Sequence, residues 1–118
     1  MQISQETAGN TCVVVVSGRL DGSTSAAFAE QVGELAVGDN PRLLLDFGAV
    51  DFVTSAGLRA VLQVVKRVKA SGGLLAMCNV QEPVREVLDI SGFAAMFGIH
   101  RERPDAIAAM AGWEARGR

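Results

Sequence analysis

Residues 51–69, DFVTSAGLRAVLQVVKRVK, join the end of a strand-like run to a strongly periodic helical pattern. The apolar residues of that pattern recur at the spacing of one α-helical face, and they are Leu58, Val61, Leu62, Val65 and Val68. Two adjacent hydroxyl residues, Thr54 and Ser55, stand just before the first helical turn. This stretch therefore predicts a strand, a turn with two hydroxyls, and an amphipathic helix that packs against a sheet.

Apolar runs alternate with helical patterns along the rest of the chain. The expected strands are residues 3–7 at an edge, 11–17, 43–47, 74–78 and 97–99. The other expected helices carry apolar stripes at Phe28, Val32, Leu35 and Ala36, at Val84, Val87 and Leu88, and at Ile107, Met110 and Trp113. Strands that alternate with helices predict an α/β fold, in which helices pack on a largely parallel sheet.

Turn residues separate these elements. Residues 18–22 are expected to form a loop, and the hydroxyls that follow offer helix N-caps at Ser23, Thr24 and Ser25. Residues 38–41, GDNP, are expected to end the helix that these residues begin. The tail, residues 116–118, is expected to fray.

The size and charge of the chain limit its class. Its 118 residues fit one domain, expected to span residues 1–118. With 11 basic and 13 acidic residues the net charge is −2, which argues against nucleic acid as the main partner. The strongest local basic group is interpreted as a solvated helix end, and it consists of Lys66, Arg67 and Lys69.

Two further observations concern compartment and metal. No apolar run reaches the roughly 18 residues that a membrane span needs, and the first residues do not read as a signal peptide. We therefore expect a cytoplasmic chain with no membrane partner. Cys12 and Cys78 lie in apolar runs and are interpreted as reduced core residues. With His100 as the single histidine, they are too few for a convincing zinc site, so we expect no metal and no cofactor.

Three interpretations of Thr54 and Ser55 are open: a helix cap, a nucleophile, or a residue that another enzyme phosphorylates. Residue type alone favours a cap, which contributes about 1 kcal/mol, and a capping oxygen can also be modified. A nucleophile is disfavoured because residues 53–57 lack the first glycine of a G-x-S-x-G elbow, and nothing orders His100 as a base. No nucleotide-binding loop is present either, so we do not expect an enzyme.

Three aspartates, Asp21, Asp46 and Asp51, are expected at strand ends or in loops. The C-terminal ends of parallel strands meet at one edge, so these carboxylates can share a surface with Ser55. A carboxylate cluster could bind Mg²⁺. Ordinary solvated loop carboxylates are the favoured interpretation.

Three segments carry a family resemblance over nearly the whole chain. They are VVVVSGRLDGSTSAAF, LLLDFGAVDFVTSAGLRAVL and GGLLAMCNVQEPVREVLDISGF. In order and spacing they resemble the STAS domain of bacterial anti-sigma factor antagonists. The resemblance implies a single STAS domain, with a four- or five-stranded, mostly parallel sheet and helices mainly on one side.

The resemblance also implies a function. Members of this family bind an anti-sigma factor that is also a serine kinase, and so release the sigma factor. The kinase phosphorylates the antagonist at the start of the second helix, which breaks the complex, and a metal-dependent serine phosphatase restores it. An alternative within the same family is a STAS scaffold or a small-ligand-sensing module without this switch.

The resemblance points to particular residues at the start of that helix. Many members read Asp-Ser-Ser-Gly or Asp-Ser-Thr-Gly where this chain reads Thr54-Ser55-Ala56-Gly57. Ser55 matches the position that members with a Ser-Ala-Gly-Leu-Arg signature use, so Ser55 is the expected phosphorylation site, with Thr54 as the alternative. The expected partner-binding residues lie on one exposed edge, and they are Asp21, Ser23, Thr54, Ala56, Gly57 and Arg59.

Overall fold

The computed structural model describes residues 1–38 and 40–113. Residue 39, in the expected GDNP turn, and the tail that was expected to fray lie outside the described residues. The elements in chain order are β1 (Gln2–Ala8), β2 (Thr11–Leu20), α1 (Ser25–Gly33), β3 (Arg42–Val53), α2 (Ser55–Ala70), β4 (Leu74–Cys78), α3 (Glu82–Ser91), a 3-10 turn (Phe93–Ala95), β5 (Gly98–His100) and α4 (Arg103–Ala111). No helix in this described part is long and apolar enough to cross a membrane.

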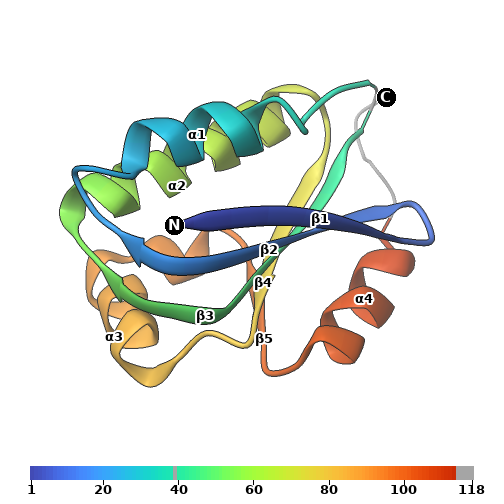
Figure 1. Ribbon diagram of the computed structural model, residues 1–118. Helices are drawn as coiled ribbons and strands as arrows, with labels where there is room; N and C mark the ends of the chain where they lie inside the picture. Colours follow the sequence, from blue (N-terminus) through green and yellow to red (C-terminus); the bar gives the residue numbers. More distant parts are fainter. Residues whose placement is uncertain (39, 114–118) are drawn as a thin grey trace.

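The sheet has five strands in the order β1-β2-β3-β4-β5. β1 pairs with β2 in the antiparallel sense, and the other three pairings are parallel. The antiparallel pairing is possible because a tight turn after Ala8 leads directly from β1 into β2. Each parallel pairing instead has a helical connection that returns the chain to the same end of the sheet. The mostly parallel α/β sheet that the sequence predicts is confirmed (Figure 1).

The helices lie mainly on one face of the sheet. α1 and α2 cover the upper face in Figure 1, whereas α4 lies below the sheet. The larger core is formed by apolar residues of α1, α2 and α3 against the facing strand residues, and it includes Phe28, Val32, Leu43, Leu45, Val61, Val64, Val65, Val68, Met77, Val84 and Leu88. On the other face, α4 completes a smaller core of Val13, Leu44, Ala76, Cys78, Ala106 and Met110.

Two strands are longer than the apolar runs indicate. β2 continues through residues 18–20, which were expected as loop, and β3 continues to Val53 instead of ending at Phe47. The two extensions pair with each other, with Gly18 opposite Val50 and Leu20 opposite Val53, across register shifts that mark bulges. A bulge breaks the regular alternation of side chains, so the sequence pattern fades although the backbone pairing continues.

Helix boundaries also differ from the expected ones. α1 ends at Gly33, so Leu35 and Ala36 follow the helix, although Ala36 remains buried in the core. α4 ends at Ala111, so Trp113 lies beyond it. β5 begins one residue later than expected, at Gly98.

The buried face of α2 is rotated slightly from the expected stripe. Val64 is buried, whereas Leu62, which was expected in the core, is only half-buried. Successive residues turn by about 100° around a helix. On this geometry Leu58 lies at one edge of the buried face, next to Val65, and Leu62 lies just beyond that edge. The expectation that Leu62 packs in the core is therefore wrong.

Both cysteines are free thiols. Cys78 is fully buried in the smaller core, and burial raises the pKa of its thiol to about 11. Cys12 is half-buried and packs against the larger core, and burial likewise raises the pKa of its thiol. Their interpretation as reduced core residues agrees with this packing.

Candidate functional site

The candidate site is built where β2 and β3 end side by side. Thr54 directly follows β3 in an extended conformation (φ −95°, ψ 176°), and Ser55 is the first residue of α2. The N–H of Thr54 donates a 3.0 Å hydrogen bond to the carbonyl of Leu20, the last residue of β2. The start of α2 and the loop that begins at Asp21 therefore lie at the same edge (Figure 1, left).

Thr54, not Ser55, caps the helix. The Thr54 side-chain oxygen accepts a hydrogen bond from the Gly57 N–H at 3.3 Å, and its carbonyl accepts one from the Leu58 N–H at 2.8 Å. A hydroxyl at the residue before the first turn satisfies one of the backbone N–H groups that the helix leaves unpaired. The two adjacent hydroxyls therefore have different environments, and residue type alone did not predict which of them caps the helix.

Ser55 is exposed, and its hydroxyl makes no hydrogen bond within the described part of the chain. The N–H groups of Ser55 and Ala56 also have no partner there, as the first N–H groups of a helix have no intrahelical acceptor. Ser55 thus presents a free hydroxyl beside two free backbone donors, at the end of a 16-residue helix.

Gly57 has a structural role at this site. It is buried, and a Cβ atom at this position would lie 2.4 Å from the Leu20 carbonyl oxygen and 2.9 Å from Leu20 Cγ. Only glycine allows α2 to begin this close to the end of β2. Gly57 was expected to contact a partner, but because it is buried we assign it to positioning the turn.

The Asp21 loop is held by its own hydrogen bonds. Asp21 Oδ1 accepts from the Ser23 N–H at 2.9 Å and from the Ser23 hydroxyl at 2.7 Å. These hydrogen bonds from Ser23, with the positive charge of Arg19, lower the pKa of Asp21. The carboxylate is therefore ionised at neutral pH and fixed at the candidate edge.

Thr24 occupies the N-cap position of α1, but its side chain does not cap the helix. Its hydroxyl accepts from the Asp21 N–H at 3.0 Å and donates to the Arg19 carbonyl at 2.8 Å. Thr24 thus holds the loop, and the Asp21 carbonyl accepts from the N–H groups of Thr24 and Ser25. The expected capping by hydroxyl side chains is wrong for this helix, because the loop uses the Thr24 hydroxyl.

A shallow groove runs between α1 and α2 beside Ser55. Its lining residues are Ser25, Ala26, Ala56, Arg59, Ala60 and Gln63. Arg59 is exposed and Ala56 is half-buried. The structure therefore brings the expected surface residues, apart from the buried Gly57, to one end of the molecule, on the Asp21 loop and the first turns of α2.

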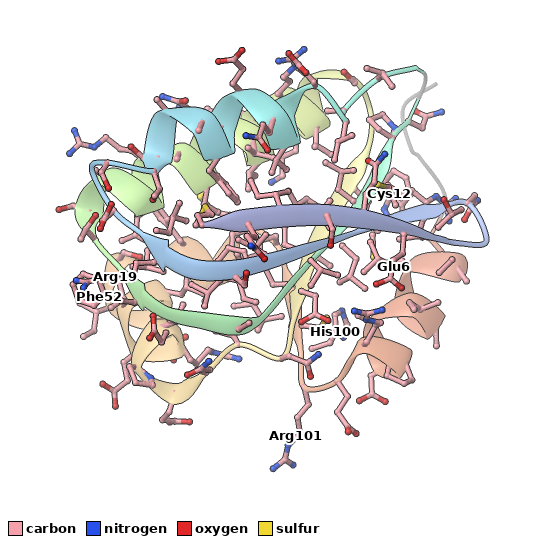
Figure 2. The ribbon with its side chains drawn as sticks, in the orientation of Figure 1. Glu6, Cys12, Arg19, Phe52, His100 and Arg101 are labelled. Atoms are coloured by element: carbon pink, nitrogen blue, oxygen red, sulfur yellow. The ribbon has the colours of Figure 1, made fainter. Side chains whose placement is uncertain are left out.

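The sequence interpretation missed one pair at this edge. The Arg19 guanidinium carbon lies 4.7 Å from the centre of the Phe52 ring, and Phe52 keeps 44% of its surface exposed. Figure 2 shows the two side chains together at the end of the sheet. Their contact follows from the bulged register, which places Arg19 opposite Phe52, and no local sequence pattern signals it.

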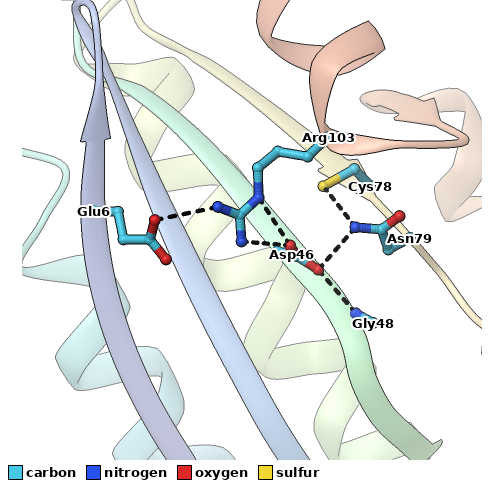
Figure 3. Close-up of polar contacts among 6 residues, drawn as sticks. All are labelled: Glu6, Asp46, Gly48, Cys78, Asn79 and Arg103. Carbon is cyan, nitrogen blue, oxygen red and sulfur yellow. Dashed lines mark hydrogen bonds and ion pairs between the residues drawn. The ribbon is translucent and has the colours of Figure 1, made fainter.

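Asp46 does not belong to this edge. Because β3 continues beyond it, Asp46 lies within the strand, on the α4 side, with only 10% of its side chain exposed. Arg103 Nε and Nη2 donate to Asp46 Oδ2 at 3.1 and 2.8 Å, and Gly48 N–H and Asn79 Nδ2 donate to Oδ1 (Figure 3). The expectation that Asp46 could share a surface with Ser55 is therefore wrong.

The Asp46 contacts have an electrostatic consequence. Burial alone raises the pKa of this carboxyl group, but hydrogen bonds from Arg103, Gly48 and Asn79 outweigh burial and lower it. Arg103 also pairs with Glu6 on β1 at 3.2 Å. This network ties the start of α4 to two strands, and no three His, Cys, Asp or Glu side chains within residues 1–38 and 40–113 could hold a metal ion.

The only histidine is remote from the candidate site. His100 ends β5, and β4 separates that strand from β3. It lines a different hollow, with residues of α3 and of the loop before α4. The structure therefore does not place His100 beside Ser55 as a general base.

The fold and the site define a small α/β domain whose candidate surface lies at the carboxyl ends of two parallel strands. A family model for the STAS domain matches residues 2–106. The chain belongs to the STAS domain family.

Curated relatives extend this assignment. The chain is 42% identical over 95 residues to a putative anti-sigma factor antagonist, BtrV, of Bordetella bronchiseptica, covering 76% of this chain and 81% of that protein. It is 30% identical over 108 residues to an anti-sigma F factor antagonist of Paenibacillus polymyxa, covering 91% and 92% of the two chains. The Bacillus protein SpoIIAA in its phosphorylated form has a similar fold, with a TM-score of 0.67, 19% identity, and coverage of 92% and 98%.

Proposed function

We propose that this chain is an anti-sigma factor antagonist controlled by phosphorylation. In its unmodified form it binds an anti-sigma factor that is also a serine kinase. Phosphorylation of Ser55 releases that partner, and a metal-dependent serine phosphatase restores binding. The names of the curated relatives support the antagonist role, and a phosphorylated form of SpoIIAA is known for this fold.

The geometry of Ser55 is the observation that carries the proposal. A kinase needs a hydroxyl that it can reach, and the Ser55 hydroxyl is exposed and free of hydrogen bonds within the described residues. The neighbouring Thr54 hydroxyl is half-buried and already bonded to the Gly57 N–H. This difference supports Ser55 as the acceptor and keeps Thr54 as the alternative.

The free protein can accept the added charge. A phosphate on Ser55 carries about −1.5 to −2 charges at neutral pH. The start of α2 offers the unpaired N–H groups of Ser55 and Ala56, and the helix dipole favours a negative charge there by about 0.3–1 kcal/mol. The fold should therefore persist after phosphorylation.

The same charge should oppose the complex. We place the docking edge at the exposed or half-buried residues of the two neighbouring turns, namely Asp21, Ser23, Thr54, Ser55, Ala56 and Arg59. A phosphate enclosed there loses its water and is repelled by Asp21, which already carries a fixed negative charge. We expect these effects together to disfavour the complex by about 3 kcal/mol or more. Each 1.4 kcal/mol is a factor of ten in affinity, so binding should weaken by about 100-fold or more.

The test uses the partner kinase with ATP, followed by intact mass measurement and calorimetric titration. The wild-type chain should gain one phosphate and lose affinity, whereas Ser55→Ala should gain none and bind constitutively. Thr54→Ser, which keeps the cap, should still be phosphorylated at residue 55.

Two results would change the proposal. A phosphate on Ser55→Ala would identify Thr54 as the acceptor. A wild-type chain that gains no phosphate from the kinase would contradict the switch and favour the alternative role, a STAS scaffold or ligand-sensing module.

A further inference from the structure

Arg59 is an exposed cation close to the proposed phosphate. It is the fifth residue of α2, about one helical turn beyond Ser55, and it lines the groove beside Ala56. Its side chain is exposed, and it forms no ion pair with any residue that the structure describes. Arg59 therefore has a positive charge that no residue in the described part of the unmodified chain neutralises directly.

Helix geometry brings Arg59 toward Ser55. Residues four positions apart lie on the same helical face, and each Cα–Cβ bond tilts toward the helix N-terminus. A long side chain at residue 59 is thus directed back toward residue 55. An acidic group that precedes a basic group by four residues is the more favourable order for a helical ion pair. Phosphorylation of Ser55 would create that order.

No carboxylate competes for Arg59 in the first turn of α2, which contains no acidic residue. Asp21 is the acidic side chain of the neighbouring loop, and its Oδ1 is held by Ser23. Arg19, not Arg59, contributes to lowering the pKa of Asp21. Arg59 is therefore available to a new anion on its own helix.

We propose that Arg59 binds the phosphate of phosphorylated Ser55 and holds it against the first turn of α2. This inference rests on the proposed function, because it concerns the phosphorylated form. The planar guanidinium group can donate two parallel hydrogen bonds to one phosphate in a fixed geometry, whereas a lysine ammonium acts as a compact point charge. Arg59 thus acts as a positioning residue that fixes the phosphate in the released state.

The pair predicts a shift that can be measured without the partner. A cation beside the phosphate favours its doubly charged form, and so lowers its second pKa from the ordinary value of about 6. The protein would be made with phosphoserine installed at residue 55 during synthesis, and the second pKa of its phosphate would be measured by ³¹P NMR titration. Arg59→Gln should raise this pKa by about 0.15–0.35 unit relative to wild type, as expected for a helical ion pair. Arg59→Lys should give an intermediate value.

Lys66→Gln is the matched control, because Lys66 is an exposed cation further along the same helix. It should leave the pKa of the phosphate unchanged, and added salt should reduce the effect of Arg59→Gln. Equal pKa values in wild type and Arg59→Gln, or equal shifts in Arg59→Gln and Lys66→Gln, would overturn the ion pair. Because the phosphate is installed chemically, this outcome is independent of whether a kinase modifies Ser55.

Discussion

At the scale of single residues, the central feature is that two adjacent hydroxyls differ in their contacts. Thr54 caps α2 through the Gly57 N–H, whereas the Ser55 hydroxyl makes no hydrogen bond with any other described residue. The sequence shows that a hydroxyl pair precedes a helix, but it does not show which of the two is the N-cap. The backbone decides this, because the bond from the Thr54 N–H to Leu20 sets where the helix begins.

The first stability prediction follows from this difference. Thr54→Ala should lower the free energy of unfolding by about 1 kcal/mol, because the Gly57 N–H loses its acceptor. Ser55→Ala should change it by less than about 0.5 kcal/mol, since the hydroxyl is exposed and unbonded. Urea unfolding of both variants measures the difference, with Thr54→Ser as a control that keeps the cap. Equal losses in the two alanine variants would contradict the assignment of the cap.

At the scale of elements, α2 shows which features of a helix its apolar periodicity predicts and which it does not. The helix and most of its buried face were predicted, because apolar residues recur at a helical spacing over several turns. The edge of the buried face was not predicted correctly, because Leu62 lies at the boundary between the sheet and the solvent. Whether a boundary residue is buried depends on how the helix rolls on the sheet, which its own sequence does not set.

Two leucines on α2 allow a matched test. Leu58 keeps 9% of its surface exposed and belongs to the larger core, whereas Leu62 is half-buried and lies outside that core. Leu58→Ala should lower the free energy of unfolding by about 2–5 kcal/mol, because it leaves a cavity. Leu62→Ala should lower it by less than about 1 kcal/mol. A larger loss for Leu62→Ala than for Leu58→Ala in denaturant unfolding would show that the helix is rotated.

At the scale of the whole molecule, α4 is attached to the second face of the sheet by arginines at its two ends. Arg103 at its start pairs with Asp46, and Arg42 of β3 donates to the carbonyls of Met110 and Trp113 near its end. The Arg42 guanidinium also lies over the Trp113 ring, 5.4 Å from its centre. These contacts join residues far apart in the chain, so they fix α4 against strands that lie much earlier in the sequence.

The Asp46–Arg103 pair predicts a dependence of stability on pH. The pKa of Asp46 is lowered in the folded protein, so its contribution is present above the ordinary aspartate pKa of about 3.9 and is lost as the pH falls through the folded value. Asp46→Asn should lower the free energy of unfolding at pH 7 by about 1.5–3 kcal/mol. The gap between variant and wild type should narrow below about pH 4.

Unfolding curves collected at several pH values measure this gap. The exposed Asp51→Asn is the control, and it should change the free energy of unfolding by less than about 0.5 kcal/mol. A gap between Asp46→Asn and wild type that stays constant down to pH 2 would contradict the role assigned to the ion pair.

The limits of the sequence at this scale have a common cause. The order of strands and helices was predicted, because each element has its own local pattern. The partner of Asp46 was not, because Arg103 lies 57 positions further along the chain and meets it only when α4 folds onto the sheet. The paired extensions of β2 and β3 were missed for a similar reason: Arg19 and Phe52 are brought together by bulged strands.

The division of tasks between Thr54 and Ser55 has a genetic consequence. The Ser55 hydroxyl is exposed and makes no hydrogen bond within the described residues, so a single base change from a TCN serine codon to a GCN alanine codon should leave a stable chain. Under the proposed function, that chain would bind its partner permanently. Purifying selection on the serine would therefore act through regulation alone, and a lineage that no longer needs the switch could lose it in one mutational step while keeping the domain.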